Sequence, residues 1–237
     1  MKDKPDWTEQ AKRNAAKEAV KHVEDGFVVG LGSGTTAAYA IEEIAKKMKR
    51  EQLRISGVPT SYQALMLAAK LGIPVTSLEE HSFLDLAVDG ADQVDPQLNL
   101  IKGMGGALAR EKIVASASKR VVIVADEGKR VKTLGAEDHP VPVEVLPMAV
   151  PLVTRNIEAL SGKPVLREGG KKVGPVVTDN GNVILDVHFG LIRKPQDLEC
   201  GLKGLVGVVE TGLFVGLADV VYFGTRSKVE KVERKAR

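Results

Sequence analysis

A lysine and a glutamate flank a glycine-rich turn in the segment IKGMGGALAREKIVA, residues 101–115. Lys102 precedes three glycines at positions 103, 105 and 106, and Glu111 follows where the pattern predicts a helix. Glycine inside an element costs roughly 0.5–1 kcal/mol relative to alanine, so this cluster requires a reason. One reason is a tight strand-to-helix turn. The other is an anion site, in which backbone N–H groups hold the anion and Lys102 and Glu111 face it.

A second glycine-rich segment, GLGSGTTAA at residues 30–38, is typical of a phosphate site. Gly34 and its neighbouring glycines keep the turn tight, while Ser33, Thr35 and Thr36 offer hydroxyls and amides at the start of a predicted helix, where anions bind well. The dinucleotide fingerprint G-x-G-x-x-G is not met, because position 35 is threonine, and the Walker pattern is absent. A capped turn without a ligand is the alternative, and this segment alone favours neither.

Two aspartates, Asp89 and Asp92, follow a predicted buried strand in the segment LAVDGADQVD, residues 86–95. Carboxylates at the end of a strand suit sugar hydroxyls and would repel a phosphate. A turn closed by an aspartate cap is the alternative. Together, the three segments supply what a phosphosugar isomerase needs: a phosphate cradle, carboxylates for hydroxyls, Lys102 for a developing oxyanion and Glu111 as a base. A solvated charged face remains the alternative for Glu111.

Metal-dependent and disulfide-stabilised classes of protein are disfavoured. The four histidines are scattered at positions 22, 81, 139 and 188, and neither H-E-x-x-H nor C-x-x-C occurs. We therefore expect no metal. The single cysteine, Cys200, excludes an internal disulfide and is compatible with a reducing cytoplasm.

Hydrophobic periodicity in the N-terminal half predicts alternating helices and strands. The strands are apolar throughout, which is typical of a parallel sheet covered on both faces. We therefore predict a doubly wound α/β fold with a mainly parallel, Rossmann-like sheet, whose ligands bind beyond the carboxyl ends of the strands. The predicted helices cover residues 8–25, 35–51, 60–72 and the segment around Glu111, and the predicted strands cover residues 27–31, 53–58, 74–78, 84–89 and 120–126.

The pattern of predicted elements changes after about residue 135. The order of predicted elements there is β-α-β-β-α-β, which matches a smaller α+β domain of the ferredoxin-like kind. These elements are a strand at 141–145, a helix beginning near Pro147 and Pro151, a strand at 164–168, a hairpin over 176–190, a helix at 196–204 and a strand at 206–210. The apolar segment 218–224 is expected to rejoin the first sheet. The predicted domains are therefore residues 1–134 plus 212–237, the catalytic α/β domain, and residues 135–211, the inserted domain.

Charge and composition argue against nucleic-acid and membrane partners. The net charge is +3, but the last twelve residues carry six basic and two acidic side chains, so the preceding 225 residues sum to −1. Aromatic residues make up only 4%, too few for a surface that stacks bases. No apolar run approaches the ~18 residues of a membrane span. We expect a cytoplasmic protein whose basic tail is the end of a solvated helix.

Five motifs in order give the sequence a resemblance to the ribose-5-phosphate isomerase A family. They are G-S-G-T-T-A (32–37), D-G-A-D (89–92), K-G-x-G (102–105), R-E-K-I (110–113) and A-D-E-x-K (125–129). The resemblance implies interconversion of ribose 5-phosphate and ribulose 5-phosphate in the pentose phosphate pathway, without cofactor or metal. We expect a small phosphorylated sugar as the partner and a homodimer or homotetramer.

The resemblance also implies roles for individual residues. Glu111 is similar to the family's general base, which moves a proton between C2 and C1 through a cis-enediolate, and Lys102 would stabilise the charge on the sugar oxygen. Asp89 and Asp92 resemble the pair that holds the hydroxyls, with Asp89 assisting ring opening. Many relatives have glycine in place of Met104, which leaves the backbone conformation of that residue open. The implied substrate-binding set is Ser33, Gly34, Thr35, Thr36, Asp89, Gly90, Ala91, Asp92, Lys102, Gly103, Met104, Gly105 and Lys129.

Two other functions fit a similar scaffold. A phosphosugar sensor would bind the ligand without turnover, but it would normally carry a DNA-binding helix pair, and none is expected before residue 30. An amino-sugar phosphate isomerase or a CoA transferase is the other alternative. The Asp-Gly-Ala-Asp and Lys-Gly-x-Gly segments favour the pentose enzyme.

Overall fold

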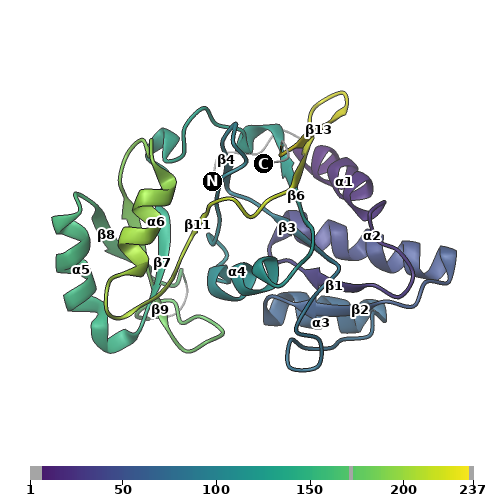
Figure 1. Ribbon diagram of the computed structural model, residues 1–237, viewed down its shortest axis with the longest axis horizontal. Coiled ribbons are helices and arrows are strands. Elements are labelled where there is room, and N and C mark those ends of the chain that lie inside the picture. The colour runs from purple at the N-terminus through teal and green to yellow at the C-terminus, as the bar shows by residue number, and fades with distance from the viewer. Residues whose placement is uncertain (1–6, 171–172, 235–237) are drawn as a thin grey trace. The chain divides into compact units, whose positions relative to one another are not determined.

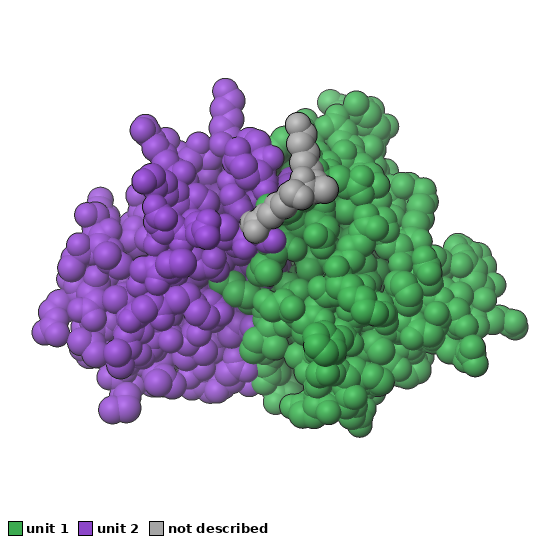
Figure 2. Space-filling view, in the orientation of Figure 1, with its two compact units in different colours: residues 1–91, 110–130, 217–237 green, residues 92–109, 131–216 purple. Residues whose placement is uncertain are grey.

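The computed structural model describes residues 7–170 and 173–234 of the chain. The chain divides into two compact units, which Figure 2 shows in different colours: unit 1 comprises residues 1–91, 110–130 and 217–237, and unit 2 comprises residues 92–109 and 131–216. The domain division expected from the sequence stays a prediction. It differs from the compact units chiefly at residues 92–109, which group with unit 2.

Unit 1 is built on a six-stranded sheet in the order β13-β12-β6-β3-β1-β2 (Figure 1). The neighbouring strands from β12 to β2 in this order all pair in parallel, and β13 pairs antiparallel with β12. The expectation that segment 218–224 rejoins the first sheet is confirmed, because β12 pairs with β6 from Val220 to Gly224. The strands are β1 (Val28–Leu31), β2 (Ser56–Pro59), β3 (Leu86–Gly90), β6 (Val121–Asp126), β12 (Val220–Gly224) and β13 (Val229–Glu233).

Helices cover both faces of this sheet, which confirms the doubly wound α/β fold. Alternate strand residues such as Val29 and Leu31 belong to one buried cluster with side chains of three helices. The residue between them, Gly30, points to the opposite face, where a Cβ would lie 2.4 Å from Val114 of the fourth helix. The first three helices are α1 (Trp7–Val20), α2 (Thr35–Glu51) and α3 (Tyr62–Leu71), and the fourth is α4 (Leu108–Ser116).

Two predictions about unit 1 were wrong. Segment 74–78 is not a strand: Val75 makes only an isolated bridge to Gly57, beyond which no ladder forms. The basic tail does not continue as a solvated helix, because residues 229–233 form the antiparallel edge strand β13. Val229 packs against the core cluster, while Lys231 and Glu233 of this edge strand are exposed. Charged side chains protect such an edge from pairing with other chains.

Unit 2 contains the predicted β-α-β-β-α-β arrangement. Its four-stranded antiparallel sheet has the order β10-β7-β9-β8, and the two helices supply buried residues such as Val153 and Leu202 to one apolar core. Only the second arm of the predicted hairpin over 176–190 is a strand. The elements are β7 (Val141–Val145), α5 (Val150–Ala159), β8 (Lys163–Leu166), β9 (Val183–His188), α6 (Pro195–Lys203) and β10 (Val208–Thr211).

A small three-stranded sheet in unit 2 was not predicted. It pairs β4 (Gln93–Val94) and β11 (Leu213–Phe214) with β5 (Leu100–Ile101), which leads directly into Lys102. Strands of two residues carry too little periodicity to be recognised from sequence. Among the helices of the described residues, none has both the length and the apolar character needed to cross a membrane.

Candidate active site

The carboxyl end of β3 in unit 1 holds the first predicted carboxylate, Asp89. This side chain is 6% exposed, and its Oδ1 accepts hydrogen bonds from the backbone N–H groups of Gly90 (2.7 Å) and Ser33 (3.2 Å). Gly90 in turn lies beside Thr36, since a Cβ on Gly90 would be 3.8 Å from the Thr36 Cβ. The carboxyl ends of neighbouring parallel strands meet at one edge of a sheet. The loop after β1, which we call the phosphate-type loop (residues 32–34), therefore meets the end of β3 at Asp89.

Gly32 permits this close approach. A Cβ on Gly32 would lie 2.2 Å from Asp89 Oδ1 and 2.6 Å from the Asp89 Cα, closer than real side chains come. We expect Gly32→Ala to lower the free energy of unfolding by about 1–3 kcal/mol, as overpacking typically does. Denaturant titration measures this change. The control is Gly201→Ala in α6, where a Cβ would meet nothing within 4 Å; equal midpoints for the two variants would contradict the prediction.

Ser33 is held by two hydroxyls that follow β2. Its Oγ lies 2.7 Å from Thr60 Oγ1 and donates to Ser61 Oγ at 2.6 Å. Thr60 also donates to the carbonyl of Leu31 at 3.1 Å, and Ser61 accepts from Ala64 N–H and so caps α3. We did not predict Thr60 and Ser61 as part of the site. The signal that could have found them is a polar Thr-Ser pair directly after an apolar strand that neighbours β1.

The remainder of the phosphate-type loop forms the N-terminus of α2. Gly34 stands at the N-cap with φ of 91°, and its N–H donates to Gln63 Oε1 at 2.9 Å. Thr35 and Thr36 are the first two residues of the helix, where backbone N–H groups lack intrahelical partners. The positive φ explains a glycine at position 34, because other residues adopt this conformation at a cost.

A buried lysine of α1, Lys12, reaches the same loop. Its side chain is nearly inaccessible, and its Nζ lies 3.5 Å from Thr35 Oγ1 and 3.8 Å from Asp126 Oδ2. Asp126 ends β6, and its Oδ1 accepts from Gly128 N–H in the following turn, Glu127–Lys129. Lys129 is therefore presented from the carboxyl end of β6. Lys12 was missed from the sequence; the available signal was a lysine on the buried, alanine-rich face of a helix.

Lys102 in unit 2 is buried, with 4% of its surface exposed. Its backbone N–H donates to the carbonyl of Gly212 at 2.9 Å, which fixes the start of the glycine loop. Its ammonium lies 5.4 Å from the centroid of the Phe214 ring, within the range of a cation–π interaction. A charged side chain at this depth is rare unless a structural partner or a ligand compensates its desolvation.

The glycine loop after Lys102 is a tight turn with two positive φ angles. These occur at Gly103 (101°) and Gly106 (81°), and Gly106 N–H donates to the Gly103 carbonyl at 3.0 Å. Met104 is not among the described non-glycine residues with positive φ, so its side chain causes no backbone strain. Its N–H donates to Asp92 Oδ2 at 3.1 Å, which brings the second predicted aspartate to the loop.

Glu111 lies in the first turn of α4 and is 5% exposed, so the solvated charged face is not its environment. Neighbouring Arg110 places its guanidinium 5.4 Å from the Tyr62 ring centroid in unit 1. The predicted site residues are divided between the two units. Unit 1 carries Ser33, Gly34, Thr35, Thr36, Asp89, Gly90, Ala91, Glu111 and Lys129, and unit 2 carries Asp92, Lys102, Gly103, Met104 and Gly105.

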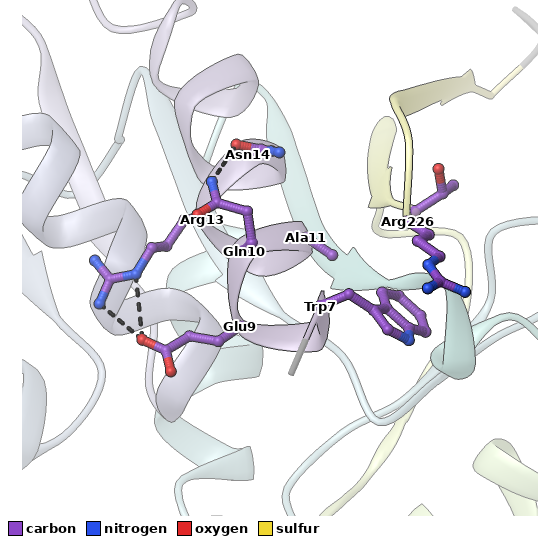
Figure 3. Close-up of a pocket in the computed structure, with 8 residues that line it drawn as sticks. Trp7, Glu9, Gln10, Ala11, Arg13, Asn14 and Arg226 are labelled. Atoms are coloured by element: carbon purple, nitrogen blue, oxygen red, sulfur yellow. Dashed lines mark hydrogen bonds and ion pairs between the residues drawn. The ribbon is translucent and has the colours of Figure 1, made fainter. Parts of the chain in front are cut away.

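A separate cavity of ≈ 700 Å³ lies along α1 and the loop after β12 (Figure 3). Four of the side chains that line it pair with one another. Glu9 forms an ion pair with Arg13 at 3.0 Å, and Gln10 donates a hydrogen bond to Asn14 at 2.8 Å. None of the predicted site residues lines it. Within the described residues, no group of three or more histidine, cysteine, aspartate or glutamate side chains could hold a metal ion.

Comparisons with known proteins agree on one family. The family model for ribose 5-phosphate isomerase A (phosphoriboisomerase A) matches residues 56–228. The ribose-5-phosphate isomerase A of Thermosynechococcus vestitus is 51% identical over 220 residues, which cover 92% of this chain and 93% of the relative. That of Pyrococcus horikoshii is 47% identical over 227 residues, or 95% and 99% of the two chains.

Solved structures give the same result. The ribose 5-phosphate isomerase A of Methanocaldococcus jannaschii has a TM-score of 0.91 and 44% identity, and the match covers 95% of this chain and 99% of that one. A D-ribose-5-phosphate isomerase in complex with phospho-erythronic acid has a TM-score of 0.93 and 47% identity, with coverage of 96% and 99%.

Proposed function

The chain belongs to the ribose 5-phosphate isomerase A family, and we propose from this premise which residues interconvert ribose 5-phosphate and ribulose 5-phosphate. The observation that carries the proposal is the burial of three charged groups that the resemblance implies: Asp89, Lys102 and Glu111 are 6%, 4% and 5% exposed. Burying charged side chains is costly, and groups kept at such a cost are concentrated at functional sites.

Glu111 acts as the general base. Its carboxylate removes the proton from C2 of the open-chain aldose, and the electrons move to give an enediolate. Return of the proton to C1, together with loss of the O2 hydroxyl proton and protonation of O1, yields the ketose, so the reaction only moves protons and involves no net oxidation. A positioned carboxylate that is shielded from water suits this task. Such a reaction requires no nicotinamide, in keeping with the missing dinucleotide fingerprint.

Lys102 stabilises the negative charge that develops on the sugar oxygen. A buried ammonium acts strongly on such a charge, because little water screens it and it needs no reorientation during the reaction. Asp92 and Asp89 accept hydrogen bonds from the sugar hydroxyls, and Asp89 assists ring opening. The two backbone N–H bonds to Asp89 Oδ1 support this role, since they hold the carboxylate in one orientation.

The amides at the N-terminus of α2 bind the phosphate, together with the hydroxyls of Thr35 and Thr36. Lys129 supplies a positive charge from the turn after β6. We assign Lys12 to the phosphate as well, because its ammonium is buried and lies 3.5 Å from Thr35 Oγ1. A helix N-terminus with adjacent cations is a common phosphate site.

Formation of ribulose 5-phosphate from ribose 5-phosphate, followed after exhaustive dialysis against EDTA, tests the proposal. We expect turnover to persist at an unchanged rate without metal or nicotinamide, because the described chain carries no cluster of metal ligands. Ligand binding without any turnover would instead favour a phosphosugar sensor. Loss of activity that a divalent metal restores would contradict the metal-free mechanism.

The protein acts in the cytoplasm on a small phosphorylated sugar, without nucleic acid, and assembles as a homodimer or homotetramer. Apolar side chains of unit 2 support the assembly: Met148 is 91% exposed, Val206 is 79% exposed and Leu146 is 47% exposed. Apolar surface of this kind commonly marks protein interfaces. We expect light scattering to give two or four times the mass of one chain. The mass of a single chain at micromolar concentration would contradict the assembly.

A further inference from the structure

Arg167 occupies an unusual position in unit 2, directly after the edge strand β8. Its guanidinium makes a bidentate contact with the carboxylate of Asp186 in β9: Nε donates to Oδ2 at 2.8 Å, and Nη2 donates to Oδ1. The two side chains are only 12% and 18% exposed. The backbone N–H of Arg167 also donates to the carbonyl of Ile184 at 2.9 Å. A two-pronged contact of this kind fixes the plane of the guanidinium as well as its place.

The remaining group of the guanidinium, Nη1, contacts the glycine loop. It donates to the carbonyl of Gly103 at 3.0 Å and to the carbonyl of Met104 at 3.0 Å. These are consecutive carbonyls in the turn that follows Lys102. One arginine therefore fixes two adjacent peptide planes, from a position more than sixty residues later in the chain.

The peptide between Gly103 and Met104 is also held on its N–H side, by Asp92. The C=O and N–H of a trans peptide point in opposite directions, and no described peptide bond is cis. With the Gly103 carbonyl on Arg167, the Met104 N–H faces away and donates to Asp92 Oδ2 at 3.1 Å. A continuous series of contacts thus runs from Asp186 through Arg167 and the Gly103–Met104 peptide to the Asp92 carboxylate.

We propose that Arg167 is a positioning residue for the isomerisation, which orients the Asp92 carboxylate through the Gly103–Met104 peptide. The inference rests on the proposed role of Asp92 at the sugar hydroxyls. Lysine cannot replace the arginine, because a single ammonium lacks the rigid, planar set of donors that grips Asp186 and both carbonyls at once. A small displacement of a substrate-holding group is enough to cost a large factor in rate.

Steady-state kinetics of Arg167→Lys tests the proposal. We expect kcat/KM to fall by about 10- to 100-fold, since misplacement by about 1 Å has an effect of this size, in a protein that remains folded at the assay temperature. The matched control is Arg193→Lys, an exposed arginine of the same unit, for which we expect wild-type kinetics. Should Arg167→Lys fail to fold, the double variant Arg167→Gln/Asp186→Asn, which removes both charges of the pair, replaces it.

A double-mutant cycle with Asp92→Asn separates positioning from general stability. If Arg167 acts through Asp92, Arg167→Lys lowers kcat/KM by less than about twofold in the Asp92→Asn background, because the effects of residues in one hydrogen-bond network are not additive. If the loss of kcat/KM in the double variant equals the product of the losses in the two single variants, the inference is overturned. It is also overturned if Arg167→Lys has a wild-type kcat/KM while Asp92→Asn lowers it. Wild-type kinetics for Asp92→Asn overturns the proposed role of Asp92 itself and the inference with it.

Discussion

Glu111→Gln is expected to lower kcat by about 10²–10⁴-fold, the usual contribution of a general base. Glutamine keeps the size of the side chain and most of its hydrogen bonds, but it cannot accept the C2 proton. Glu111 is buried in the first turn of α4, so the neutral variant relieves a desolvated charge and should fold. We therefore expect binding of ribose 5-phosphate, measured by calorimetry, to persist while turnover stops.

The control for this variant is Glu158→Gln, at an exposed position of α5. The same chemical change at that position should leave kcat and KM at their wild-type values. A loss of less than about tenfold for Glu111→Gln would be too small for a general base and would contradict the assignment. Loss of substrate binding together with turnover would show instead that Glu111 holds the substrate.

Lys102→Ala is expected to reduce kcat by about 10²–10³-fold, as removal of one group that stabilises an oxyanion typically does. The charge that Lys102 faces develops only as the enediolate forms, and interactions made mainly in the transition state act on kcat. Lys102 is buried beside the Phe214 ring, so circular dichroism and thermal unfolding must show that the alanine variant is folded.

Lys129→Ala is the matched comparison for Lys102→Ala. Lys129 is partly exposed in the turn after β6 and is proposed to face a phosphate that stays charged throughout the reaction. An interaction that is equal in the ground and transition states acts mainly on KM. We therefore expect KM to rise for Lys129→Ala with kcat little changed. The reverse division between the two variants would mean that the roles of the two lysines are exchanged.

Most of the parallel sheet could be predicted because its signals are local. The bounds of α2 at Thr35–Glu51 agree with the prediction, since a glycine turn starts the helix and its apolar residues recur at helical spacing. The strands β3, β6 and β12 were predicted because buried parallel strands are continuous apolar runs. Edge elements were harder to predict: three of the five residues of β13 are charged, and its pairing with β12 is what defines it as a strand.

The candidate site could be predicted only in part, for a related reason. Ser33 and Asp89 were recognised from their own segments, but the hydrogen bond from Ser33 N–H to the Asp89 carboxylate depends on the neighbouring strands β1 and β3. The contacts of Lys12 and Arg167 could not be predicted, because each side chain reaches a loop that is distant in sequence. Such contacts are a property of the folded chain and not of any short motif.

The most direct test of the mechanism is the fate of the C2 hydrogen in the Glu111→Gln variant. Ribose 5-phosphate deuterated at C2 is incubated with the folded variant in ordinary water, and NMR follows loss of the label. If Glu111 is the base, the label is retained and its exchange is slower than with the wild-type protein by about 10²–10⁴-fold. Exchange at close to the wild-type rate would contradict the account, and Asp89 would then become the candidate base.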